Sequence, residues 1–303
     1  MDISTYRLAA TLAPALAMAS FAAAQASSPA PAPTPTSPAP IARHYTDGET
    51  LTYQMRASNE SWTYQVKAKG VVKKDPAGHF VEEFTWTDFN SSAPMGASPQ
   101  NSDFRQILSL DPAVQMSIPD LSKAQPALIG PITDLLTFYS DLWLAIKLNR
   151  FRQAGDHAYI PFGGPSSWAD GTHVILGEDS IDFDLTLKDV DMKSHIGTLL
   201  ARHVPPAKPK VKLPAAWMQQ PVSDTPNNFV NVEKKDKKYE AEVGKEIFDD
   251  EIKFDLSDGK ILSATMNNPV QTSRRTCSDA ALTDCGEAAP HSILRQIEIR
   301  LIP

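Results

Sequence analysis

The sequence carries none of the common catalytic or nucleotide-binding motifs. Its 303 residues contain no G-x-S-x-G elbow, no H-E-x-x-H pair, no P-loop and no dinucleotide fingerprint. The seven histidines are scattered, and no two of them stand four residues apart, the spacing that places two ligands on one helix face. The sequence therefore predicts no catalytic residue, no metal site and no cofactor.

An excess of basic residues is also missing. The formal net charge is −7, whereas phosphate contact requires a basic face. The densest basic run, residues 234–238, falls at a predicted hairpin tip, where lysines are simply solvated. We expect no nucleic-acid partner.

Charge is absent from residues 8–24, an alanine-rich apolar run. Arg7 precedes this run and Ala24-Gln25-Ala26 follows it, which is typical of a secretory signal peptide. The run contains Pro14 and is shorter than the ~20 strongly apolar residues of a membrane span. We expect residues 1–26 to be cleaved after Ala26, which leaves no transmembrane span and a periplasmic or secreted protein.

Residues 27–42 lack both charge and a run of apolar side chains. They contain six prolines and one isoleucine, a composition that cannot build a core. Pro-rich chains favour extended polyproline II. The sequence predicts a disordered Pro/Ala-rich tether here, followed by a single β-rich domain over residues 43–303.

Only two cysteines are present, Cys277 and Cys285. Export permits a disulfide, and the C-x-x-C spacing of redox sites is absent. We expect a structural disulfide, which would stabilise the domain by about 2.5 kcal/mol on the chain-entropy view.

Most of the domain alternates between apolar and polar residues with period two, the pattern of half-buried strands. Asp-Pro-Ala-Gly at 75–78 and Ser-Asp-Gly-Lys at 257–260 predict tight turns between such runs. One long helix is predicted over residues 131–149, where apolar residues recur at three and four. A short helix is also expected near residues 104–108, and 205–228 reads as a long irregular segment.

These patterns predict a mainly β fold, with a curved antiparallel sheet or half-barrel packed on one long helix. A closed barrel and a β-sandwich are the alternatives, since both share this pattern of strands.

Aromatic residues crowd one predicted meander, and an ordinary core or an apolar cavity between sheet and helix would explain them. Glu82 shares the strand face of Phe84 and Trp86. It is a polar handle in a cavity, a protonated acid, a solvent-facing residue or an inward charge on an edge strand. The candidate ligand-binding residues are Trp62, Tyr64, Glu82, Phe84, Trp86, Trp143 and Trp217, with residues 205–228 as a movable cover.

A second hypothesis concerns hydrolysis. Pairing of the strands near residues 181–188 and 196–204 places Asp182 opposite His203 in the simplest register, and a carboxylate beside an imidazole can orient a base. Together with Glu82, these are the residues that an exported hydrolase of envelope or extracellular polymer would use.

The order meander, helix-containing insert and meander resembles periplasmic half-barrel carriers of the LolA-like kind. The stretches Asp-Gly-Glu-Thr-Leu-Thr-Tyr at 47–53 and Ser-Asp-Gly-Lys-Ile at 257–261 also resemble strand starts and turns of uncharacterised exported β-rich bacterial proteins. The resemblance implies binding of an acyl chain or another apolar group without catalysis. Our expectation is an exported, non-enzymatic binding protein for an apolar or amphiphilic ligand such as a lipid. The alternatives are the hydrolase and a tethered protein-interaction module.

Overall fold

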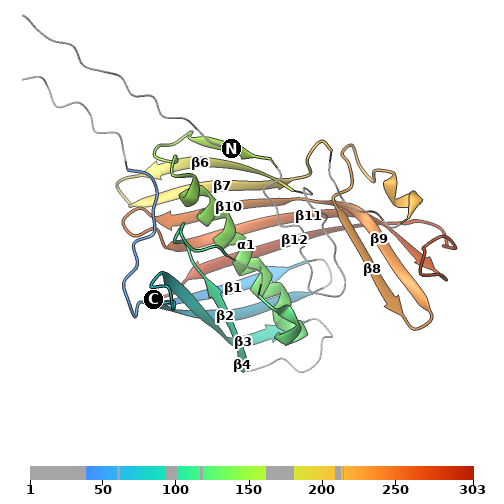
Figure 1. Ribbon diagram of the computed structural model, residues 1–303, viewed down its shortest axis with the longest axis horizontal. Helices are drawn as coiled ribbons and strands as arrows, with labels where there is room; N and C mark the ends of the chain where they lie inside the picture. Colours follow the sequence, from blue (N-terminus) through green and yellow to red (C-terminus); the bar gives the residue numbers. More distant parts are fainter. Residues whose placement is uncertain are drawn as a thin grey trace, which may run out of the picture. The chain divides into compact units, whose positions relative to one another are not determined.

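The computed structural model describes residues 39–59, 62–92, 101–116, 119–161, 181–208, 213 and 215–303. Their strands form one antiparallel sheet of twelve strands, with one α-helix across a face (Figure 1). The predicted signal peptide and most of the predicted tether lie outside the described residues.

In chain order the elements are β1 (Thr50–Ser58), β2 (Thr63–Lys74), β3 (Phe80–Ser91), β4 (Asn101–Leu108), the 3-10 helix η1 (Leu121–Lys123), α1 (Pro126–Leu148), β5 (His157–Ile160), β6 (Asp182–Asp191), β7 (Ile196–Val204), the 3-10 helix η2 (Ala216–Gln219), β8 (Phe229–Lys235), β9 (Lys238–Glu246), β10 (Phe248–Asp255), β11 (Ile261–Cys277) and β12 (Ala289–Leu301).

The sheet is open and curved. Its main path runs β4-β3-β2-β1-β12-β11-β10-β7-β6-β5, so that β4 and β5 are its two ends and do not pair with each other. The predicted fold, a curved antiparallel sheet with one long helix, is confirmed. The alternatives of a closed barrel and a two-sheet sandwich are wrong, because the described strands belong to one open sheet.

Local turn chemistry sets the hairpins. In the β2–β3 turn the amide of Gly78 bonds to the carbonyl of Asp75 at 3.0 Å, and Gly78 has a φ of +88°. Gly259, in the β10–β11 turn, has a φ of +75°. Glycine adopts such left-handed angles without steric cost, which explains why both predicted turns form.

Two predicted helices differ from those observed. Residues 101–108 form strand β4 instead of a short helix, and Gln106 and Leu108 alternate there with exposed neighbours. The long helix begins at Pro126, five residues earlier than predicted, and Pro131 lies inside it. Pro126 has the first-turn place that suits proline. Pro131 has no amide hydrogen to donate within the helix. Beside it, the hydroxyl of Thr133 donates to the carbonyls of Ile129 and Gly130.

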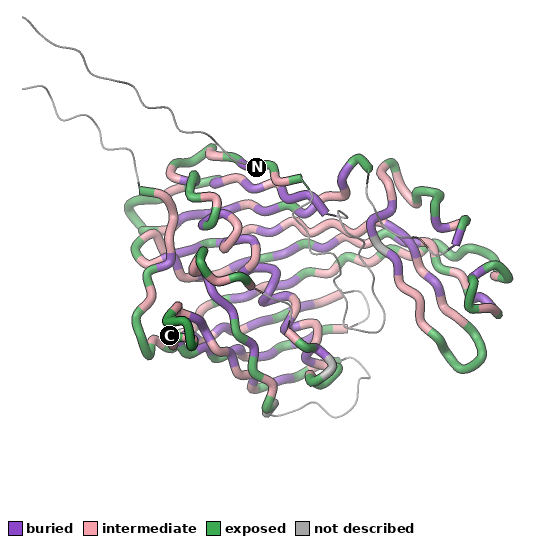
Figure 2. Tube along the Cα trace, in the orientation of Figure 1, coloured by how far each residue is buried: buried purple, intermediate pink, exposed green. Residues whose placement is uncertain are grey.

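The main core lies between α1 and the sheet, where buried positions alternate along the strands (Figure 2). Two glycines make room for aromatic rings in it. Gly70 on β2 pairs with Phe84 on β3, and Gly197 on β7 pairs with Phe254 on β10. A Cβ atom on Gly70 would lie 2.5 Å from the Phe84 ring, so each ring covers a position that only glycine leaves open.

The sheet forks along β11. The first half of this strand pairs with β10 and the second half with β9. Asn268 lies at the fork and donates to the carbonyl of Ile247 at 2.8 Å. The β8–β9 hairpin thereby forms a separate wing (Figure 1) with a small core of its own, which includes Met218, Val230 and Val243.

Candidate functional site

The candidate aromatic residues of the first meander lie on the face of the sheet that α1 covers. Tyr64 is 4% exposed, Phe84 is 0% exposed and Trp86 is 1% exposed. The edge of the Tyr139 ring, on α1, packs against Phe84 with ring centroids 5.7 Å apart. These side chains are therefore packed under the helix, as in an ordinary core.

Glu82 is buried in the same region, at 0% exposure. Its carboxylate accepts hydrogen bonds from Tyr139 of α1 and from Arg43, whose Nε lies 3.4 Å away. Arg43 also pairs with Glu49 at 2.8 Å. Burial raises the pKa of Glu82, although the charge of Arg43 and the bond from Tyr139 act in the opposite direction.

This arrangement decides between the interpretations of Glu82. Strand β3 lies between β2 and β4, so Glu82 is neither solvent-facing nor an edge-strand charge. It is a buried carboxylate with a paired guanidinium, which links the segment before β1, strand β3 and α1.

A second polar group joins the helix to the middle of the sheet. The hydroxyl of Tyr64 on β2 donates to Asp134 of α1 at 2.6 Å, and Arg295 of β12 donates to the other carboxylate oxygen at 2.8 Å. Burial beside Asp134 raises the pKa of Tyr64 well above its ordinary value. The phenol therefore stays protonated and remains a donor.

A third polar group lies two helical turns further on. The Nε2 atom of His203 on β7 lies 2.6 Å from Asp141 of α1. Asp250 of β10 lies close enough to Asp141 for their carboxyl groups to interact, and all three residues are at most 3% exposed. The His203 ring lies between two aromatic rings, with centroids 4.4 Å from Phe183 and 5.2 Å from Phe248.

The helix therefore rests on the sheet through polar contacts as well as apolar ones. A further contact comes from Gln106 of β4, whose amide donates to the carbonyl of Ile132 at 2.9 Å. Within the described part of the chain, the indole N–H of Trp86 and the side-chain oxygen of Gln106 are buried without a hydrogen-bond partner. Such groups are costly in a closed core and are available to a ligand.

The structure does not bring all the candidate residues together. Trp62 stacks on Tyr64 with centroids 6.0 Å apart, and Trp143 lies on α1 with its indole donating to the carbonyl of Asp111 at 3.1 Å. Trp217, however, belongs to the small core of the β8–β9 wing. The described part of segment 205–228 that includes Trp217 packs there, so this part does not cover the aromatic face.

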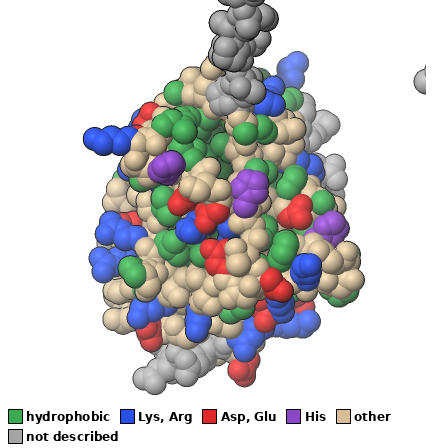
Figure 3. Space-filling model, turned by 90° about the vertical axis from the view of Figure 1, so that its left-hand side faces the viewer, with side chains coloured by type: hydrophobic (Ala, Val, Ile, Leu, Met, Phe, Trp, Pro, Cys, Tyr) green, Lys and Arg blue, Asp and Glu red, His purple; other side chains and the backbone are tan. Residues whose placement is uncertain are grey.

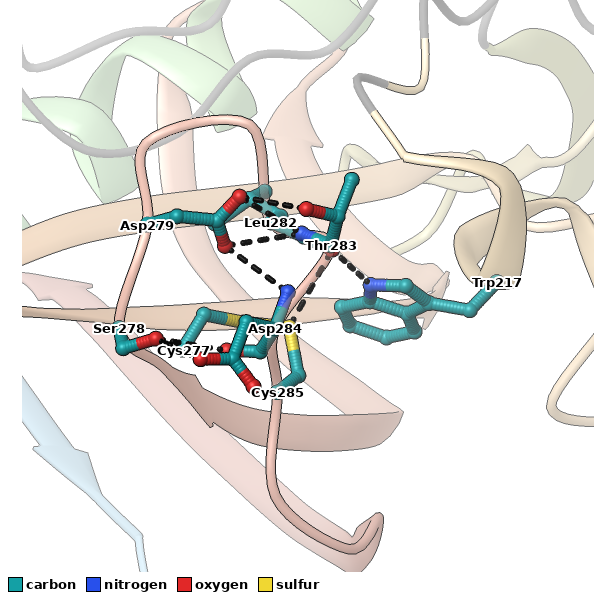
Figure 4. The surroundings of a disulfide bond; sticks show 8 residues. All are labelled: Trp217, Cys277, Ser278, Asp279, Leu282, Thr283, Asp284 and Cys285. Atoms are coloured by element: carbon teal, nitrogen blue, oxygen red, sulfur yellow. Dashed lines mark hydrogen bonds between the residues drawn. A yellow bond between two sulfur atoms is a disulfide. The ribbon is translucent and has the colours of Figure 1, made fainter.

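Cys277 and Cys285 form the predicted disulfide, with Cα atoms 4.0 Å apart (Figure 4). The loop that it closes is ordered by Asp279, whose carboxylate accepts bonds from the amide and hydroxyl groups of Thr283. The indole of Trp217 donates to the carbonyl of Leu282 at 3.1 Å. The disulfide thus holds the loop against β11, and Trp217 joins the same loop to η2. These contacts suit a structural role.

The residues of the hydrolase hypothesis lie in three separate groups. Asp182 pairs with Val204 across the strands, and His203 with Phe183, so the predicted Asp182–His203 register is wrong by one residue. Asp182 accepts a hydrogen bond from Tyr159 instead. Because residues shift faces with every step along a strand, this error separates the two side chains completely.

The opposite face of the sheet is polar. A hollow of about 950 Å³ there is lined mainly by outward-facing side chains of β1, β2, β11 and β12, among them Arg56, Gln65, Asn267 and Glu298. On another side of the molecule, seen in Figure 3, acidic and basic side chains are interspersed with hydrophobic ones. This view shows no broad patch of one charge.

The described residues contain neither a metal-binding cluster nor a membrane-spanning helix. No group of three or more His, Cys, Asp or Glu side chains there has an arrangement that could hold a metal ion. None of the helices in this part of the chain, α1 included, combines the length and the apolar character that a membrane crossing requires.

The sequence did not predict most of the polar contacts between helix and sheet, which involve Arg43, Asp134, Tyr139, Asp141, Asp250 and Arg295. One signal was present: Asp134 and Asp141 are seven residues apart and lie among the apolar positions of the predicted helix. Two acidic residues at that spacing share one face of a helix, so both point to polar partners on the sheet.

The chain matches no protein-family model, and no curated protein and no solved structure is significantly similar to it. The likeness to half-barrel carriers therefore rests on the pattern of elements alone.

Proposed function

We propose that this protein is an exported, non-enzymatic binding protein for an apolar or amphiphilic ligand, and that α1 is the movable cover of its ligand face. The ligand face consists of the inward side chains of β1, β2 and β3, including Tyr53, Tyr64, Phe84 and Trp86. The observation that carries the proposal is the set of buried hydrogen bonds between α1 and the sheet, which we call the polar seat of α1.

The seat consists of hydrogen bonds between α1 and side chains of five strands. Tyr64, Glu82, Gln106, His203 and Arg295 come from β2, β3, β4, β7 and β12 respectively. When a purely apolar interface opens, it exposes apolar surface on both sides. Polar pairs instead exchange their bonds for bonds to water, and their net contribution is only about 0.5–3 kcal/mol each, with the larger values for bonds to charged groups.

Opening of α1 would expose an aromatic surface that an acyl chain or another apolar group can cover. The unpaired indole N–H of Trp86 would meet a hydrogen-bond acceptor there, such as the carbonyl or carboxylate of an amphiphile. Ligand affinity then depends on the fraction of molecules in which α1 is open.

The proposed location outside the cytoplasm is supported by two features. The apolar run before Ala26 has the signature of a signal peptide. The disulfide between Cys277 and Cys285 suits an oxidising compartment, periplasmic or secreted.

The test is native mass spectrometry of the protein purified from an exporting host, followed by organic extraction. We expect an N-terminus at Ser27 and extra mass that extracts as a lipid or another apolar molecule. An apo mass that persists after incubation with total lipid extracts and with long-chain fatty acids would contradict the proposal.

A further inference from the structure

We infer that Asp141 and Asp250 hold one proton between them, and that this proton keeps the C-terminal half of α1 seated on β7 and β10. The inference concerns how α1 is held and stands whether or not a ligand binds beneath it.

The first step is the shortage of hydrogen-bond donors. Within the described residues, Oδ2 of Asp141 and both carboxylate oxygens of Asp250 are buried and have no donor. His203 serves the other oxygen of Asp141, at 2.6 Å. A buried carboxylate without donors is strongly unfavourable, so three such oxygens in one place require either a donor or a lost charge.

A proton on Asp250 supplies the missing donor and removes one of the charges. The protonated carboxyl becomes a donor to Asp141, removes one of two adjacent negative charges and leaves Asp141 paired with His203. Burial raises the pKa of Asp250 well above its ordinary value, and the charge and the hydrogen bond of Asp141 act in the same direction.

The surrounding charges favour the same state. Asp134 of α1 and Asp249 of β10 add to the negative potential at Asp250. Glu246 of β9 is a further carboxyl nearby, and burial raises its pKa although Arg295 and His203 act against this. With all four inner carboxyls ionised (Asp134, Asp141, Glu246 and Asp250), Arg295 and His203 are too few to neutralise them.

The strand register explains why the proton acts on the helix. Asp250 pairs with Ala201, two residues from His203, so both side chains lie on the inner face of neighbouring strands. Asp141 reaches them from α1. Loss of the proton leaves two carboxylates facing each other across the contact between helix and sheet, and only separation of α1 from β10 restores their hydration.

The sign of the pH dependence follows. Asp250 binds its proton more tightly in the seated state than in the open state, where its pKa is about 3.9. Above that pH the equilibrium constant between the seated and open states falls tenfold per pH unit, equivalent to about 1.4 kcal/mol. The fall stops once Asp250 ionises in the seated state as well.

Hydrogen exchange of the α1 amides, corrected for the intrinsic pH dependence of exchange, tests this. In the wild-type protein we expect the protection of residues 141–148 to fall as the pH rises. In Asp250→Asn, whose amide donates to Asp141 and cannot ionise, this fall is expected to disappear. The matched control is Asp249→Asn, on the same strand but paired with Arg202 on the outer face at 2.8 Å, which should retain most of the pH dependence because its charge affects Asp250 less than that of Asp141 does.

A second measurement observes the proton directly in the wild-type protein and uses the variant only for assignment. Carbon-13 spectra of aspartate-labelled wild type should contain one carboxyl signal that remains protonated at neutral pH, and Asp250→Asn should lack it. Absence of that signal, an unchanged pH dependence in Asp250→Asn, or an equal loss of pH dependence in Asp249→Asn would each overturn the inference.

Discussion

The hydroxyl group of Tyr64 on β2 donates a 2.6 Å hydrogen bond to Asp134 on α1, and the same carboxylate accepts a 2.8 Å bond from Arg295 on β12. One helical side chain thus joins two strands that are separated by β1 in the sheet. The position of α1 over the sheet depends on polar groups of this kind as much as on apolar packing.

Replacement of Tyr64 by phenylalanine removes one of these two bonds and leaves the ring in place. Hydrogen bonds to charged groups contribute about 1.5–3 kcal/mol, so we expect the free energy of unfolding in urea to fall by that amount. The matched control is Tyr239→Phe on the β8–β9 wing, because the ring of Tyr239 contacts Lys234 and phenylalanine keeps that contact, so the change should cost less than about 0.5 kcal/mol. Equal losses at the two positions would count against the role of Tyr64.

Arg43→Met should be among the most destabilising single changes, because it leaves the Glu82 carboxylate buried without its cation. Removal of one partner of a buried pair costs about 3–5 kcal/mol. Adding Glu82→Gln should recover part of this loss, which a double-mutant cycle in urea measures. Additive losses would show that the two side chains do not act as a pair.

Arg43→Met should also change the pH dependence of stability. Without the guanidinium, the pKa of buried Glu82 rises further, whereas in the unfolded chain it is about 4.3. The folded protein then holds a proton that the unfolded chain releases, so stability falls as the pH rises above that value. Unfolding curves at pH 5 and pH 8 should differ more for Arg43→Met than for the wild type.

Gly70→Ala tests the contact between the glycine on β2 and the Phe84 ring. An added Cβ would lie 2.5 Å from that ring, so the ring must move within a packed core, at a cost of about 1–3 kcal/mol. In Gly286→Ala the nearest atom would be 3.7 Å away, and stability should be nearly unchanged. If thermal unfolding shows the same small effect in both variants, the ring does not cover Gly70 as described.

Loss of the disulfide should affect the β8–β9 wing and spare the helix. The double variant Cys277→Ser and Cys285→Ser opens a nine-residue loop, which lowers stability by about 2.5 kcal/mol on the chain-entropy view. Trp217 packs on that loop, so hydrogen exchange should increase around η2 and residues 278–286. Comparable loss of protection in α1 would contradict the separation of the two cores.

The sequence predicted the strands and hairpins well, because alternation and turn residues such as Gly78 and Gly259 act locally. It did not predict the partners of Asp134 and Asp141, since these lie on β2, β7, β10 and β12 and depend on the order of strands in the sheet. Glu82 was recognised as unusual from its strand face, but its partner Arg43 lies in the irregular segment before β1, which carries no periodic signal. The Asp182–His203 prediction failed by a single register step.

The central claim is that α1 must leave the sheet before a ligand binds, and a titration with a dansyl-labelled long-chain fatty acid tests it directly. Asp134→Ala removes two bonds that seat α1 and leaves the ligand face of the sheet unchanged. We predict that it binds the probe at least tenfold more tightly than the wild type, because less free energy is required to open the helix. The disulfide-free variant, destabilised elsewhere, should bind like the wild type. Unchanged or weaker binding by Asp134→Ala, or no binding by any of the three proteins, would contradict the account.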